Sequence, residues 1–206
     1  ILFPEITFTP DQFIKKVQHA VTTDGFCTIV VSEGIKDAQG KFLSEHGSVD
    51  AFGHHQLGGV APRMESLIKQ QLNYKCHWAV SDYLQRSARH IAAKIDVEQA
   101  YALGAAAVDA ALSGKNNVMM TIERLPASTY QWQIGSAPLA DVANVEKTVP
   151  RDFITADGFG ITAACRNYLT PLIQGEAYPE YAKGLPTYKP LTYSLAEKKC
   201  EKIMTE

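Results

Sequence analysis

The chain has 206 residues, of which 46% are apolar and 20% are charged, and its formal net charge is −2. This composition is typical of a globular protein with a sizeable core, and without a basic excess nucleic-acid binding is not indicated. The longest apolar stretch, residues 101–112, is interrupted by Asp109 and is too short to span a membrane.

The cysteines indicate the cellular compartment of the protein, and the first residues indicate whether the chain is a fragment. Four cysteines are spread along the chain without a CxxC motif or a Cys/His pair at zinc spacing. This pattern predicts reduced, mostly buried thiols and a cytoplasmic protein. The chain opens on the apolar residues 1–3 without a methionine, so we interpret it as a fragment or as one product of a cleaved chain.

The first predicted unit is a strand, a helix and a second strand. Residues 9–12 read Thr-Pro-Asp-Gln, which predicts a capping box with proline at the first helical position. The helix ends at Asp24-Gly25, and the apolar run 27–31 is typical of a buried parallel strand.

Glu33 follows this strand directly. In open α/β sheets, ligands bind beyond the carboxyl ends of the strands. An ionised carboxylate there can accept hydrogen bonds from sugar hydroxyls. A glutamate on the surface of an ordinary turn is an equally good interpretation of the position alone.

The middle of the chain is predicted as a loop over residues 35–60, a helix over 60–72 and a strand over 74–80. The adjacent residues His54 and His55 suggest a metal site, but a Gly-Gly turn before a helix is the simpler interpretation. We expect His77 and Trp78, on the predicted strand, to face the core.

A cluster of hydrogen-bond donors follows that strand. Tyr83, Arg86, Arg89 and His90 lie within eight residues. Arginine matches phosphate oxygens with two parallel hydrogen bonds, so this cluster suits a phosphate group. The alternative is a solvated basic helix start in which one arginine pairs with a nearby aspartate.

The last third of the chain is predicted to begin with a helix from Asp96 to a glycine cap at Gly114, with Gln99 completing an Asp-x-x-Gln cap. Strands at 117–122 and 129–134 follow, and short helices lie beyond Pro138. The Asp-Gly-Phe-Gly sequence at 157–160 is interpreted as a turn. Walker, GxGxxG, GxSxG and HExxH motifs are absent from the sequence.

The order of four stretches resembles the C-terminal half of the phosphofructokinases, in particular the pyrophosphate-dependent group. The stretches are Val30-Val31-Ser32-Glu33-Gly34, the run from Phe52 to Pro62, Tyr83-Leu84-Gln85-Arg86, and Asp96-Val97-Glu98-Gln99-Ala100-Tyr101. Each is weak alone, and their combination in this order is specific.

The resemblance implies that Glu33 binds the sugar and that Tyr83 and Arg86 bind the 6-phosphate of fructose 6-phosphate, with Leu84 and Gln85 lining the pocket. A competing match to the family pattern Gly-His-x-Gln-Arg-Gly-Gly spans residues 53–59. There Leu57 replaces the arginine, and leucine cannot bind phosphate. A further arginine that many relatives place a few residues upstream is missing, and only Lys75 and His77 could substitute for it.

The resemblance also implies a three-layer α/β/α fold with a mostly parallel sheet, here its C-terminal portion. The expected domains are 1–84, the second half of the sugar-phosphate domain, 85–137, part of the donor domain, and 138–206, C-terminal helices and an extension. The catalytic base, the donor loop and the Mg²⁺ ligands are expected upstream of residue 1, so no catalytic residue or metal ligand is assigned in this chain and the isolated chain is predicted to be inactive.

The implied function is glycolytic transfer of phosphate from diphosphate to the 1-hydroxyl of fructose 6-phosphate, giving fructose 1,6-bisphosphate. The implied assembly is a homodimer or homotetramer that includes the missing N-terminal half. An ATP-dependent 6-phosphofructokinase and a non-catalytic, sugar-phosphate-binding or regulatory subunit are the alternatives.

Overall fold

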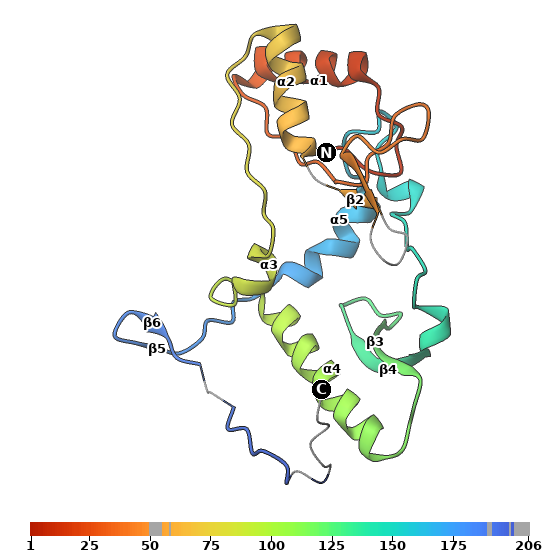
Figure 1. Ribbon diagram of the computed structural model, residues 1–206, viewed down its shortest axis with the longest axis vertical. Coiled ribbons are helices and arrows are strands. Elements are labelled where there is room, and N and C mark those ends of the chain that lie inside the picture. The colour runs from red at the N-terminus through yellow and green to blue at the C-terminus, as the bar shows by residue number, and fades with distance from the viewer. Residues whose placement is uncertain (50–54, 58, 189–190, 198, 200–206) are drawn as a thin grey trace, which may run out of the picture.

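The computed structural model describes residues 1–49, 55–57, 59–188, 191–197 and 199. Figure 1 shows a group of elements around α1 and α2, a second group around α4, β3 and β4, and α3 and α5 between them. In chain order the elements are α1 (Pro10–Asp24), β1 (Glu45–Val49), β2 (His55–Leu57), α2 (Val60–Leu72), α3 (Leu84–Ser87), α4 (Lys94–Leu112), β3 (Val118–Arg124), β4 (Trp132–Pro138), η1 (Leu139–Asp141), η2 (Arg151–Phe153), α5 (Ala163–Leu169), η3 (Thr170–Ile173), β5 (Tyr181–Ala182) and β6 (Leu185–Pro186).

Helix α1 occupies the range that the sequence predicts. Pro10 opens it, and Gly25, at φ 83°, closes it by donating its N–H to the carbonyl of Val21. The capping-box prediction is wrong in one respect, because the Thr9 side chain makes no capping hydrogen bond. A proline at the first helical position lacks an N–H, so the helix start has one donor fewer to satisfy.

Helix α2 packs against α1 and completes the main core. Val60, Met64 and Ile68 are buried on one face, at the four-residue spacing that places side chains above one another. The helix stops at Asn73, whose φ of 53° is left-handed. The core consists of Leu2, Phe8, Phe13, Val17, Ile35, Leu43, Val60, Met64 and Ile68.

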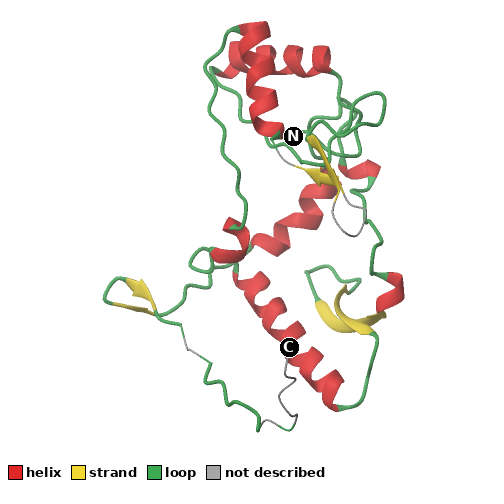
Figure 2. Cartoon of the chain, viewed as in Figure 1, coloured by secondary structure: helices red, strands yellow, loops and turns green. Residues whose placement is uncertain are grey.

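The strands form three antiparallel pairs, so the described chain is a mixed α/β structure with small sheets (Figure 2). In the largest sheet, β3 pairs with β4 from Val118↔Pro138 to Arg124↔Trp132. β1 and β2 lie within residues 35–60, where the sequence predicted only a loop.

The expected, mostly parallel sheet is not formed by the described residues. Residues 26–31 and 74–81 are extended, but their parallel pairing is limited to one bridge between Leu2 and Val31. A parallel ladder forms between two neighbouring strands. The described residues supply no neighbouring strand for the rest of these two segments.

Helix α4 begins at Lys94, two residues before the predicted start, and Asp96 is therefore not its cap. The N–H of Lys94 donates to the carbonyl of Gly175 at 3.0 Å, so a distant segment provides the partner that a capping side chain would otherwise supply. At the other end of the helix, the predicted glycine cap is confirmed. Gly114 follows the last turn and has a left-handed φ of 80°.

The short helices expected beyond Pro138 are confirmed, and so is the turn at residues 157–160. Gly158 has φ 78° and donates its N–H to the carbonyl of Thr155. Asp157 in this turn accepts from Lys16 of α1 at 2.8 Å, which ties the turn to the first helix. Within the described part of the chain, no helix combines the length and the apolar character that crossing a membrane requires.

Candidate functional site

A groove with a volume of about 1200 Å³ lies between the two extended segments and the helices that cover them. Residues 26–31 form one side, residues 74–82 form the other, and α2 contributes Val60, Met64 and Ile68. Glu33 also lines the groove, at the end of the first segment. The two segments that the sequence predicted as strands therefore border a common space.

The backbone at Glu33 is held firmly while its side chain is exposed. The Ser44 hydroxyl, which is only 2% exposed, donates to the carbonyl of Glu33 at 2.8 Å. The carbonyl of Leu43, the residue before Ser44, accepts a hydrogen bond from Arg63 Nη1 at 2.9 Å. This bond links the segment to the first turn of α2. The carboxylate is thus presented on a fixed backbone and is free to accept hydrogen bonds.

The predicted phosphate-binding element forms α3 and the residue before it. Tyr83 precedes the helix, and its carbonyl accepts from the N–H of Arg86 at 2.9 Å. The Arg86 guanidinium lies over the Tyr83 ring, 5.3 Å from the ring centroid. Leu84 is largely exposed, and the Gln85 side chain lies outside the described residues.

The two arginines of the predicted donor cluster have different surroundings. Arg89 Nη1 donates to the carbonyl of Ala177, so this guanidinium is part of the packing between α3 and the C-terminal segment. Among the described residues, no carboxylate forms an ion pair with Arg86 or Arg89, and pairing with a nearby aspartate is therefore not observed. Arg86 is exposed and keeps its five donors available.

The structure brings Tyr83 and Arg86 together, and it places Glu33 and Asp82 on the same groove. Tyr83 and Arg86 follow Asp82 in the chain but do not line the groove. Arg86 therefore does not line the groove that Glu33 lines, and no contact joins the two side chains.

The expectation that His77 and Trp78 face the core is wrong. Both are exposed and line the groove, and Trp78 Nε1 donates to Glu65 Oε2 at 3.1 Å. Side chains alternate along an extended chain, so the half-buried Tyr74 and Cys76 take the inward positions and leave His77 outward. Trp78 lies on the side of Tyr74 and Cys76 but is still 50% exposed. Sequence reasoning missed Glu65 and this groove, although it predicted both the helix over residues 60–72 and the strand over residues 74–80 that border them.

Charged and thiol groups around the groove are influenced by their neighbours. A hydrogen bond from Lys69, at 2.7 Å, lowers the pKa of Glu65 and raises that of Lys69. Burial raises the pKa of the Cys27 and Cys76 thiols, which favours their neutral form. Cys27 and Cys76 are half-buried and Cys165 is buried, all as free thiols, so the expected burial holds for Cys165 alone among those described.

The described residues do not bring together three or more histidines, cysteines or carboxylates that could hold a metal ion. His54 and Gly58 of the His-His-Gln-Leu-Gly-Gly stretch lie outside the described residues, as does Cys200. Among the described groups, the exposed Arg86 guanidinium on α3 is suited to a phosphate group, and the exposed Glu33 carboxylate is suited to hydroxyl groups.

Comparisons with known proteins identify the relatives of this chain. No family model matches it. The pyrophosphate–fructose 6-phosphate 1-phosphotransferase of Methylococcus capsulatus is 58% identical over 199 residues, which cover 97% of this chain and 47% of that protein. The crystal structure of the pyrophosphate-dependent phosphofructokinase from Nitrosospira multiformis superimposes with a TM-score of 0.82 at 52% identity, covering 98% of this chain and 47% of that chain.

The chain is a homologue of the pyrophosphate-dependent phosphofructokinases. The predicted family is thereby confirmed, and so is the α/β fold at the level of a phosphofructokinase match. The chain spans about half the length of these phosphofructokinases. A more distant ATP-dependent 6-phosphofructokinase from Mycobacterium tuberculosis is 30% identical over 151 residues, or 73% of this chain and 41% of that protein.

Proposed function

We propose that the complete protein containing this chain transfers a phosphoryl group from diphosphate to the 1-hydroxyl of fructose 6-phosphate, giving fructose 1,6-bisphosphate. The observation that supports this most is the 58% identity to a pyrophosphate-dependent enzyme along 97% of the chain. The identity to an ATP-dependent relative is only 30% over 73% of the chain, which favours diphosphate as the donor.

In this proposal the chain binds the sugar phosphate. Arg86 is exposed on α3 and has no carboxylate partner among the described residues, so its positive charge is free to anchor the 6-phosphate. Tyr83, under the Arg86 guanidinium, adds a phenolic hydroxyl. The predicted roles of Leu84 and Gln85 in lining the pocket stay part of this proposal. Glu33 accepts hydrogen bonds from hydroxyl groups of the sugar.

The donor side of the site belongs to another part of the protein. Phosphoryl transfer depends on holding donor, metal and acceptor in line, and the described residues bring together no group of three or more possible metal ligands. Mg²⁺, which supplies charge neutralisation in this family, would be held by residues outside this chain. The isolated chain is therefore expected to bind sugar phosphate weakly and to have no turnover.

The groove supports a proposal for the complete fold. Residues 27–31 and 74–80 would be strands of a mostly parallel sheet in a three-layer α/β/α domain, with the space between them filled by a strand from outside this chain. Val30 and Val80 are 61% and 56% exposed, and both have the β-branched shape that favours a packed sheet. The divisions at residues 84 and 137, the cytoplasmic location and the homodimer or homotetramer stay predictions.

A turnover assay of the complete protein with diphosphate or with ATP, each with Mg²⁺ and fructose 6-phosphate, tests the proposal. We expect turnover with diphosphate and a rate with ATP that is lower by a factor of at least about 100, which corresponds to about 2.7 kcal/mol of transition-state discrimination. Turnover with ATP alone would establish the ATP-dependent alternative. Sugar-phosphate binding without turnover on either donor would establish the non-catalytic one.

A further inference from the structure

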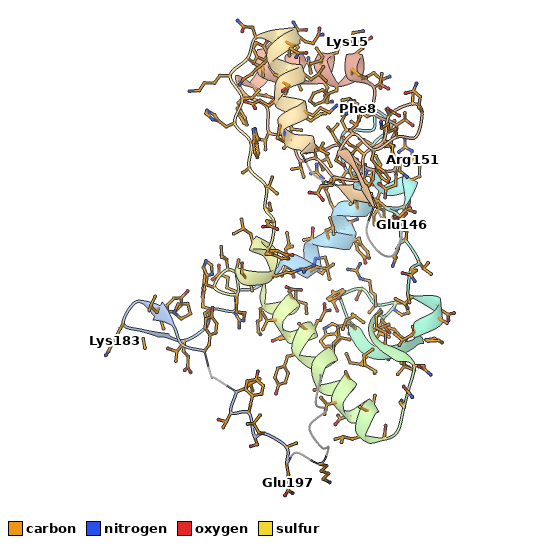
Figure 3. The ribbon with its side chains drawn as sticks, in the orientation of Figure 1. Phe8, Lys15, Glu146, Arg151, Lys183 and Glu197 are labelled. Atoms are coloured by element: carbon orange, nitrogen blue, oxygen red, sulfur yellow. The ribbon has the colours of Figure 1, made fainter. Side chains whose placement is uncertain are left out.

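The C-terminal extension, residues 178–188 and 191–197, lies apart from the packed body of the chain (Figure 1). It begins near α3, forms the β5–β6 hairpin and then continues as an extended segment. Figure 3 labels Lys183 at the hairpin and Glu197 near the end of the described segment. Among the described residues, no strand pairs with residues 191–197.

The extension leaves the body from a fixed point. The N–H of Ala177 donates to the carbonyl of Ala92 at 3.2 Å, and Ala93 and Glu176 form an antiparallel bridge. The Arg89 guanidinium also donates to the carbonyl of Ala177. These contacts fix the direction in which the chain enters the extension. The extension therefore starts from a segment that is hydrogen-bonded to the body of the chain.

The extended segment carries an apolar face without a partner. Leu191, Tyr193 and Leu195 alternate with Thr192 and Ser194, and successive side chains of an extended chain point to opposite faces. The three apolar side chains are 76%, 84% and 98% exposed. Alternation of this kind is typical of a strand that buries one face.

We propose that residues 191–195 form a strap that packs its apolar face on the part of the complete protein that lies outside this chain. The Nitrosospira multiformis structure, whose chain is about twice as long, matches 98% of this chain and therefore includes most of the extension. A segment held on the same polypeptide has a high effective concentration near its binding surface, which favours this occupant over a second copy. The strap proposal rests on the unpartnered apolar face and on the greater length of the relatives, and it does not depend on which phosphate donor is used.

Backbone hydrogen exchange in the complete protein tests the strap. The amides of Thr192 to Leu195 should exchange at least about 100-fold more slowly than expected for an unstructured peptide, while the Lys183-Gly184 turn of the hairpin serves as an exposed internal reference. If residues 192–195 exchange as fast as that turn, the segment packs on nothing and the proposal is wrong.

Two matched variants of the complete protein separate the occupants. The face variant L191S/Y193S/L195S should lower the Tm by at least about 3 °C, and the control T192A/S194A, on the opposite face of the same segment, should change it by less than about 1 °C. The molecular mass from light scattering should be the same for both. A smaller mass for the face variant alone would show that the strap binds a second copy, and an unchanged Tm would show that it binds nothing; either result overturns the proposal.

Discussion

Replacing Arg86 with alanine in the complete protein should weaken binding of fructose 6-phosphate strongly and leave the fold intact. The guanidinium is exposed, lies over the Tyr83 ring and has no carboxylate partner among the described residues. Its removal creates no cavity and leaves no charge unpaired, so the free energy of unfolding should change by less than about 0.5 kcal/mol.

The expected size of the effect follows from the hydrogen bonds that the guanidinium can form. A hydrogen bond to a charged group contributes about 1.5–3 kcal/mol. If one such contribution is lost, the KM for fructose 6-phosphate should rise by a factor of about 10 to 150. The kcat should fall much less, because a contact to the remote 6-phosphate is made equally in the ground state and in the transition state.

Initial rates measured over a wide range of fructose 6-phosphate, at saturating diphosphate and Mg²⁺, give the two constants separately. Arg86→Lys tests the geometry, since lysine keeps the charge but not the planar pair of donors, and it should recover only part of the affinity. Ser87→Ala is the matched control, because the Ser87 hydroxyl donates to the carbonyl of Tyr83, the residue before the same helix, and faces no predicted ligand. A KM for Arg86→Ala within about 2-fold of the unchanged protein would refute the role of Arg86 as phosphate anchor.

Two further substitutions test the sugar-binding carboxylate and an electrostatic contact of the fold. Glu33→Gln should raise the KM for fructose 6-phosphate by a factor of about 5 to 30 with the Tm unchanged, because the side chain is exposed; a lower Tm with normal kinetics would assign Glu33 a structural role only. Asp157→Asn should lower the Tm at pH 7 by about 1–3 °C, since Asp157 and Lys16 are half-exposed and such a pair contributes little. Hydrogen bonds from Lys16, Thr155 and the Phe159 N–H lower the pKa of Asp157 in the folded protein, so its contribution is present above about pH 4 and is lost as the pH falls through the folded-state pKa. The Tm difference measured by calorimetry should therefore narrow at pH 3 relative to pH 7, and an equal difference at both would contradict this assignment.

Elements held by short-range interactions were predictable. The range of α2 follows from apolar residues at helical spacing, which the structure confirms over Val60–Leu72. The antiparallel pair β3 and β4 lies within a few residues of its predicted range, because a short connection brings the two strands together. Interactions of this kind are encoded within a few residues of one another.

The start of α4 and the two arginines show where local reasoning fails. Lys94 opens the helix because the carbonyl of Gly175, more than 80 residues away in the chain, accepts its N–H. Arg86 and Arg89 are equivalent donors in the sequence, and the contact with Ala177 makes Arg89 a packing residue. Neither contact leaves a signal in the neighbouring sequence.

By itself, the sequence determined the family, the first two helices and the residue types suited to a phosphorylated sugar, because these depend on motifs and on periodicity along the chain. Only the tertiary structure decided which arginine is free, that Glu33 is presented by the buried Ser44, and that the segments 26–31 and 74–81 face a groove. The physical reason is that these features depend on which segments of the chain meet in three dimensions. Hydrogen bonds between distant backbone segments, and the space beside an unpaired strand, arise only from that meeting.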